Sequence, residues 1–83
     1  MKILFVKSAE KELLHLNKSL GQRIIQKISL LKNDPYGQSS QKLEGSKGYR
    51  IRVGDYRIVY IIGKENQAIL IIKIGHKREI YRQ

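Results

Sequence analysis

The spacing of apolar residues divides the chain into a helical first half and a strand-rich second half. Residues 2–6 form a short apolar run that predicts a buried strand. Two stretches of helical spacing follow, separated by a polar turn at 17–21. Ser8 is a suitable N-cap for the first helix, and Pro35 should end the second helix by Asp34. The helical apolar positions are Ala9, Leu13, Leu14 and Leu16, then Leu20, Ile24, Ile25, Ile28 and Leu31.

The second half contains apolar stretches separated by turn residues. Residues 34–47 are rich in Gly, Ser and Gln and predict a loop. Three strands are expected at about 48–53, 56–62 and 67–75, followed by a polar, basic tail. This order predicts one α+β domain over residues 1–83, with an N-terminal strand, an αα-hairpin and a three-stranded antiparallel meander. The helices should pack on one face of the sheet.

Gly54-Asp55 predicts a two-residue hairpin turn, which fixes the pairing of the flanking strands. Arg52 then lies opposite Arg57, and directly paired residues share a face of the sheet. Arg50, Arg52 and Arg57 therefore fall on one side. The opposite side, assigned to the core under the helices, carries Tyr49, Ile51, Val53, Tyr56, Ile58 and Tyr60.

Three arginines on one face destabilise a sheet unless an anion or a carboxylate lies among them. One interpretation is a solvated face on which the arginine stems cover apolar surface. The other is a phosphate-binding platform, and the clustering favours it. A register shift of one residue would separate Arg57 from Arg50 and Arg52.

Composition supports a polyanionic partner. The 83 residues include 17 basic and seven acidic ones, for a net charge of +10. Five of the six arginines lie in the second half, and the planar arginine fork suits phosphate. The absence of cysteine excludes disulfides and thiolate metal sites and is compatible with the cytoplasm. Two histidines and scattered carboxylates show no metal-ligand spacing. No apolar run is long enough for a signal peptide or a membrane span.

The tail adds groups suited to RNA cleavage by transesterification, which requires charge stabilisation and proton transfer. His76 could move protons near neutral pH, and Tyr81 could stack on a base. Each also has a plainer interpretation, because a terminal histidine is often a surface residue and a tyrosine can fill a core. The basic residues beside them are Lys77, Arg78 and Arg82.

Three segments together resemble the RelE/ParE toxin superfamily, and the resemblance covers essentially the whole chain. They are KLEG at 42–45, GYRIRVGDYRIVY at 48–60 and IGHKREIY at 74–81. The resemblance implies a compact α+β toxin encoded beside an antitoxin. RelE-type members enter the ribosomal A site and cleave mRNA by attack of the 2′-hydroxyl on the adjacent phosphate, without a metal or other cofactor.

The resemblance also implies a set of site residues. Arg57 and Arg78 would stabilise charge on the phosphorane, and Arg50 and Arg52 would hold the RNA backbone and assist proton transfer. Tyr81 would orient the cleaved nucleotide. Some relatives carry lysine where Arg50 and Arg52 stand, and arginine is a poor general base. That departure favours Tyr81 or His76 as the base. The expected RNA contacts are Arg50, Arg52, Lys47, Lys77 and Arg82.

Two alternatives stay open. A ParE-like toxin would share the fold but inhibit DNA gyrase without cutting RNA, and an inactive relic would bind nucleic acid only. In each toxin case we expect an acidic antitoxin as partner. For the nuclease we also expect the ribosome and mRNA. The toxin–antitoxin complex could bind operator DNA, and no membrane is expected.

Overall fold

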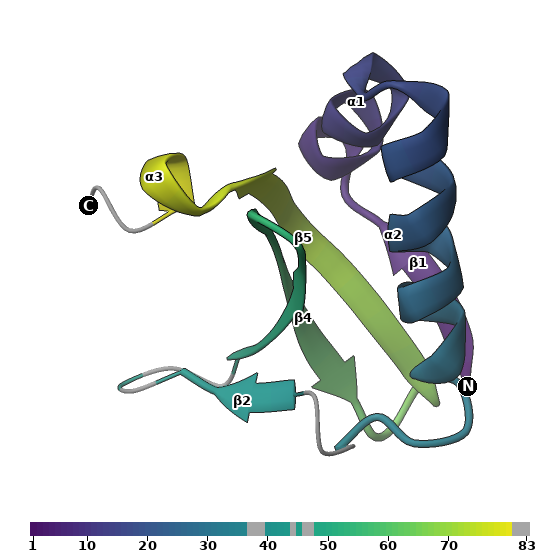
Figure 1. Cartoon of the computed structure of the whole chain (residues 1–83). Coiled ribbons are helices and arrows are strands. Elements are labelled where there is room, and N and C mark those ends of the chain that lie inside the picture. Colours follow the sequence, from purple (N-terminus) through teal and green to yellow (C-terminus); the bar gives the residue numbers. More distant parts are fainter. Residues whose placement is uncertain (37–39, 44, 46–47, 81–83) are drawn as a thin grey trace.

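The protein folds as a five-stranded sheet with two helices on one face, as the α+β prediction requires (Figure 1). The structure is a computed structural model that describes residues 1–36, 40–43, 45 and 48–80. The sheet order is β1-β5-β4-β3-β2. In chain order the elements are β1 Lys2–Phe5, α1 Lys7–His15, α2 Lys18–Leu30, β2 Ser40–Lys42, β3 Gly48–Val53, β4 Tyr56–Gly63, β5 Ala68–His76 and α3 Lys77–Ile80.

The helix starts differ from the predicted ones. The helix α1 begins at Lys7, so Val6 occupies the N-cap and the prediction of Ser8 as the cap is wrong. The predicted turn at 17–21 is also mostly helix, because α2 begins at Lys18. Asn17 caps it by accepting a 2.9 Å hydrogen bond from the Leu20 N–H. The polar side chains that suggested a turn therefore form the cap and first turn of α2, which ends before Asp34 as expected.

The predicted hairpin register is confirmed. Arg52 lies opposite Arg57, and Val53 lies opposite Tyr56 across the Gly54-Asp55 turn. Gly54 has a positive φ of 58°, which a glycine adopts without strain. The strand β5 continues the meander by pairing antiparallel with β4, and β1 joins its other side in parallel.

Two elements were not predicted. The strand β2 lies inside the segment expected to be loop, and it pairs antiparallel with β3. Its sequence, Ser40-Gln41-Lys42, has no apolar alternation, so only the pairing with β3 makes it a strand. The short helix α3 lies in the polar, basic tail, for which no helix or strand was predicted.

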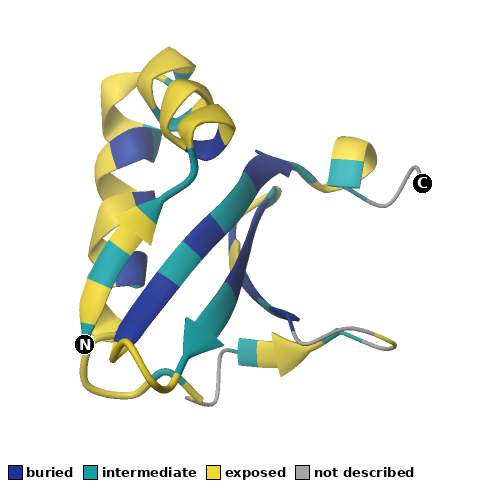
Figure 2. Ribbon diagram, turned by 180° about the vertical axis from the view of Figure 1, so that it is seen from behind, coloured by how far each residue is buried: buried dark blue, intermediate teal, exposed yellow. Residues whose placement is uncertain are grey.

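The core lies between the two long helices and one face of the sheet (Figure 2). Helix residues Ala9, Ile24 and Ile28 meet the apolar side of the hairpin predicted from the register. Tyr49 and Tyr56 pack against this core and are partly buried. Its fully or nearly fully buried members are Ala9, Ile24, Ile28, Leu31, Ile51, Val53, Ile58, Tyr60, Ile69, Ile71 and Ile74.

Tyr60 ties the core to the segment that follows α2. Its hydroxyl donates to the Pro35 carbonyl at 2.7 Å and lies 2.6 Å from Ser40 Oγ. One hydroxyl has a single proton to give, so Ser40 donates to Tyr60. Burial raises the pKa of Tyr60 above its usual 10.0. The phenol therefore stays protonated and keeps its bond to Pro35 at neutral pH.

Candidate nucleic-acid interface

The candidate site lies on the outer face, which we define as the sheet face opposite α1 and α2. Alternation along β3 and β4 puts Arg50, Arg52 and Arg57 on this face, because the core residues Ile51, Val53 and Ile58 occupy the other. The structure thus brings the three predicted arginines together on one surface.

The three arginines differ sharply in exposure. Arg52 is exposed, whereas Arg50 is 9% and Arg57 8% exposed. The Arg50 guanidinium donates to Gln41 Oε1 on β2. Arg57 Nη1 donates to the carbonyls of Gly54 at 2.9 Å and Tyr56 at 3.0 Å. Arg57 therefore holds the hairpin turn as well as carrying charge, and Arg52 is the member of the three that faces solvent.

The helix α3 is fixed to the same turn. The Lys77 N–H donates to the Asp55 carbonyl at 2.8 Å, and Lys77 Nζ lies 3.7 Å from Asp55 Oδ1. Gly75 lies opposite Arg57 on the outer face. A Cβ at Gly75 would lie 3.5 Å from Glu79 Oε2 and 3.5 Å from a side-chain carbon of Ile80. Thus α3 folds over the outer face and brings the Glu79 carboxylate beside the strand position of Arg57.

Glu79 was not singled out from the sequence. The sequence did hold a clue to its position, because a glycine in a strand often marks the close approach of another group, and Glu79 follows Gly75 by four residues. A carboxylate beside the strand position of Arg57 is one of the two kinds of group, an anion or a carboxylate, that were expected to offset the repulsion among the arginines.

His76 lies on a different side of the sheet from Arg57. It pairs with Tyr56, and the two rings meet edge to face with centroids 5.6 Å apart. Its Nδ1 accepts a hydrogen bond of 3.2 Å from the Arg78 N–H, so the neutral ring carries its proton on Nε2. Arg78 is exposed on α3. The predicted site residues Tyr81, Arg82 and Lys47 lie outside the residues that the structure describes.

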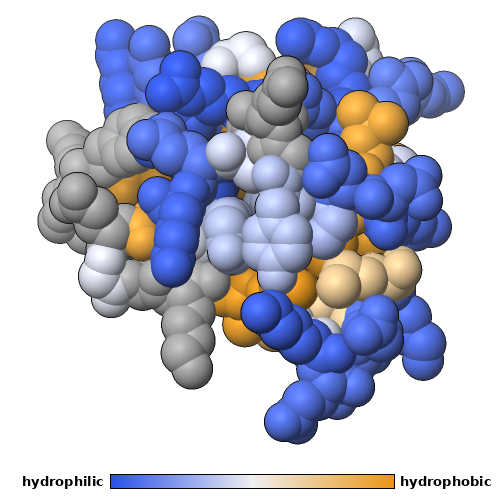
Figure 3. Space-filling view, turned by 90° about the horizontal axis from the view of Figure 1, so that it is seen from below, coloured by the Kyte–Doolittle hydropathy of each residue, from blue (hydrophilic) through white to orange (hydrophobic). Residues whose placement is uncertain are grey.

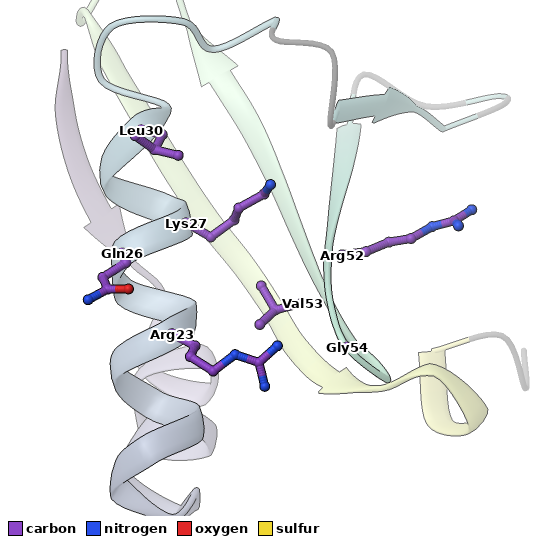
Figure 4. Close-up of a pocket in the computed structure, with 7 residues that line it drawn as sticks. All are labelled: Arg23, Gln26, Lys27, Leu30, Arg52, Val53 and Gly54. Atoms are coloured by element: carbon purple, nitrogen blue, oxygen red, sulfur yellow. The ribbon is translucent and has the colours of Figure 1, made fainter.

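A pocket of about 340 Å³ opens between α2 and the end of β3 (Figure 4). Arg23 and Lys27 point from α2 toward the hairpin, and Val53 points into the space between them. Arg52 points away from α2, toward the outer face. The cationic surface therefore continues from the outer face around the hairpin to α2, a contribution of the helix that the sequence analysis did not single out.

The described residues contain no cluster of three or more His, Cys, Asp or Glu side chains that could hold a metal ion. Within the same residues, no helix is long and apolar enough to cross a membrane.

The chain is similar to toxins of type II toxin–antitoxin systems. The profile of the family described as "ParE toxin of type II toxin-antitoxin system, parDE" matches residues 3–81. No curated protein sequence matches the chain.

Solved toxin structures share the fold. The intact E. coli RelBE toxin-antitoxin complex matches with a TM-score of 0.81 at 23% identity, over 90% of this chain and 94% of that chain. The archaeal RelE-RelB complex from Pyrococcus horikoshii OT3 matches with a TM-score of 0.80 at 28% identity, over 92% of this chain and 93% of that chain. A YoeB/ParE toxin from Agrobacterium tumefaciens matches with a TM-score of 0.81 at 18% identity, over 92% of this chain and 98% of that chain.

Proposed function

Because the chain belongs to the ParE toxin family of type II toxin–antitoxin systems, we propose that it acts as a toxin by cleaving mRNA in the ribosomal A site. The observation that carries this proposal is the outer face, where Arg50, Arg52 and Arg57 lie together and α3 folds over the strand position of Arg57. A group of guanidiniums in fixed positions suits the charge that develops on a phosphate during cleavage.

The chemistry needs no metal. The ribose 2′-oxygen attacks the adjacent phosphorus, and the bond from phosphorus to the 5′-oxygen breaks. The products are a 2′,3′-cyclic phosphate and a 5′-hydroxyl, so one proton must leave the 2′-oxygen and one must reach the 5′-oxygen. Arg57 and Arg78 would stabilise the phosphorane, and exposed Arg52 with Arg50 would hold the backbone.

Proton transfer is proposed for Tyr81 or His76. Either residue would act as the base that takes the proton from the 2′-oxygen. Because the strand position of His76 faces away from Arg57, His76 would reach the RNA only around the end of the sheet. Tyr81, Lys47, Lys77 and Arg82 would complete the contacts to the nucleotide and its backbone.

The proposed partners follow from the charge. An acidic antitoxin would neutralise the cationic surface, as expected for a toxin whose neighbours in structure were solved in RelE-RelB complexes. We place the toxin in the cytoplasm, where ribosomes and mRNA are found, and propose that the toxin–antitoxin complex binds operator DNA.

The family match favours a second candidate function. ParE-like members act on DNA gyrase and are not nucleases, and the family profile that matches here is described as ParE toxin. If the chain is such a gyrase inhibitor, the outer face would contact a protein or DNA, and the arginines would take no part in RNA cleavage.

A cell-free translation reaction with a defined mRNA, run beside a gyrase supercoiling assay, distinguishes the nuclease from the gyrase inhibitor. The 5′ ends of the message are mapped by primer extension, with and without ribosomes, beside an Arg52→Gln variant. Arg52 is preferred to Arg57 for this control because Arg57 also supports the hairpin turn. We expect cuts at A-site codons only with ribosomes, and their loss in the variant. Intact mRNA together with inhibited gyrase supercoiling would reject the nuclease in favour of the alternative.

A further inference from the structure

A second pocket lies on the helix-facing side of the sheet, at the end away from the Gly54-Asp55 turn. Its volume is about 590 Å³. Lys42 pairs with Tyr49 and Tyr49 with Tyr60, so their side chains share the face opposite the outer face. The residues that line it are Tyr36, Lys42, Tyr49, Ile62, Lys64 and Glu65.

The pocket contains a preformed aromatic platform. The Tyr49 ring stacks on the buried Tyr60 ring, with centroids 5.7 Å apart and planes 20° apart. Tyr36 meets Tyr49 edge to face at 5.5 Å. Because the Tyr60 hydroxyl donates to the Pro35 carbonyl, the residue before Tyr36 is tied to the core. The ring of Tyr36 is thereby held in place while the residue stays 52% exposed.

Cations surround this platform. Lys42 reaches it from β2, and Lys64 from the turn between β4 and β5. Glu65 is the acidic residue of the lining, which leaves the pocket with a net positive charge. Figure 3 shows this end of the molecule, where side chains of intermediate hydropathy lie at the centre, with hydrophobic and strongly hydrophilic ones around them.

We propose that this pocket binds single-stranded RNA, with a base stacked on Tyr36 and the flanking phosphates held by Lys42 and Lys64. An exposed ring beside cations is the arrangement by which proteins hold unpaired bases. The Glu65 carboxylate can accept a hydrogen bond from an amino group of the base. The choice of RNA rests on the proposed function, whereas the stacking site itself does not.

The site would act as a second RNA contact, separate from the arginine cluster because it lies on the opposite face of the sheet. RNA from two sources has the required chemistry, namely the message beyond the cleaved codon and an unpaired segment of ribosomal RNA. Both present a base for stacking and a phosphate on each side.

Binding is measured by fluorescence anisotropy with a labelled single-stranded RNA oligonucleotide and no ribosomes. We expect Tyr36→Leu to weaken binding on the order of tenfold, because one base–aromatic stack is lost, and Tyr36→Phe to bind like the wild type. Lys42→Gln with Lys64→Gln should reduce the slope of log K against log salt by roughly 0.7 for each lysine. A matched pair on the helices, Lys11→Gln with Lys18→Gln, should leave more of the slope intact.

Unchanged affinity in Tyr36→Leu would overturn the proposal. If Tyr36→Leu lowers the melting temperature enough to confuse the result, the two lysine pairs decide, and equal slopes in both would also overturn it. The wild-type cleavage assay is independent, so RNA binding through this pocket without cleavage would reject the nuclease and keep the site.

The source of the RNA is found by ultraviolet crosslinking of ribosome-bound toxin, followed by mapping of reverse-transcription stops. Stops in the message that disappear in Tyr36→Leu identify mRNA as the ligand, and stops in ribosomal RNA that disappear identify the ribosome. Crosslinks in both RNAs that are identical in wild type and Tyr36→Leu would contradict the proposal.

Discussion

At the scale of single residues, Arg52 shows how a binding surface can cost stability. Its charge lies directly opposite that of Arg57 in the β3–β4 pair, and like charges in this position repel. We expect Arg52→Gln to raise the free energy of unfolding by about 0.2–1 kcal/mol at low salt while abolishing mRNA cleavage. Urea denaturation and primer extension measure the two effects.

The control for this prediction is Lys32→Gln, which removes one exposed positive charge from the turn after α2. It should change stability less than Arg52→Gln, because it does not relieve a directly paired charge. The gain for Arg52→Gln should shrink in high salt. A loss of stability in Arg52→Gln would mean that its stem covers apolar surface, as the alternative interpretation of the arginine face holds.

Tyr60 provides a second prediction at this scale. Tyr60→Phe leaves the Pro35 carbonyl without the 2.7 Å hydrogen bond and removes the acceptor for Ser40. We expect a loss of about 1–2 kcal/mol in the free energy of unfolding. Tyr36→Phe, which removes a hydroxyl from a half-exposed ring, is the matched control and should cost less.

The same residue should make stability depend on alkaline pH. Burial raises the pKa of Tyr60 in the folded state above the usual 10.0, so the folded protein retains this proton when the unfolded chain loses it. The stability that Tyr60 contributes is complete below pH 10.0 and falls as the pH rises from there through the folded-state pKa. In Tyr60→Phe the free energy of unfolding, measured by urea denaturation at each pH, should fall less steeply over that range. A fall as steep as in the wild type would mean that Tyr60 is not the group responsible.

At the scale of elements, α3 leaves room for only a small side chain at Gly75. A Cβ there would lie 3.5 Å from Glu79 and Ile80 atoms, which is an ordinary contact. We therefore expect Gly75→Ala to keep α3 in place. Gly75→Val adds two further carbons on the side that α3 covers, and we expect it to cost about 1–3 kcal/mol and to displace the helix.

Hydrogen exchange of the amides in α3 tests this displacement directly. Gly75→Val should increase exchange at residues 77–80 and reduce cleavage, because α3 carries Arg78. The Lys77 N–H is the sharpest probe, since it bonds to the Asp55 carbonyl. Normal protection there in Gly75→Val would show that α3 tolerates the larger residue.

The elements also show which features of the structure could be predicted from sequence patterns and which could not. The Gly54-Asp55 turn predicted the β3–β4 register correctly, because turn length and alternation are local properties. β2 was missed because Ser40-Gln41-Lys42 becomes a strand only by pairing with β3. Alternation placed the three arginines on one face but could not show that two of them are buried and hydrogen-bonded, Arg50 to Gln41 and Arg57 to the hairpin carbonyls. The Tyr36 platform was likewise invisible, since it joins four separate segments.

At the scale of the whole molecule, the net charge of +10 acts on folding and on binding with opposite signs. A highly charged small protein repels itself in the compact state, and salt screens this repulsion over about 10 Å at 0.1 M. The Lys77–Asp55 ion pair is exposed at both residues and contributes little to stability, so screening it with salt costs little. We therefore expect the melting temperature to rise when salt is added at neutral pH.

RNA binding should respond in the reverse direction, because each phosphate contact releases counterions and loses strength in salt. Calorimetry and fluorescence anisotropy on the same samples, from low to high sodium chloride, measure both trends. Sulfate is avoided because it also stabilises by exclusion from the protein surface. Stability that falls with salt would mean that ion pairs outweigh the repulsion. If the two trends do oppose each other, the cationic surface is retained at a cost to folding, as expected when its charge serves to bind a polyanion.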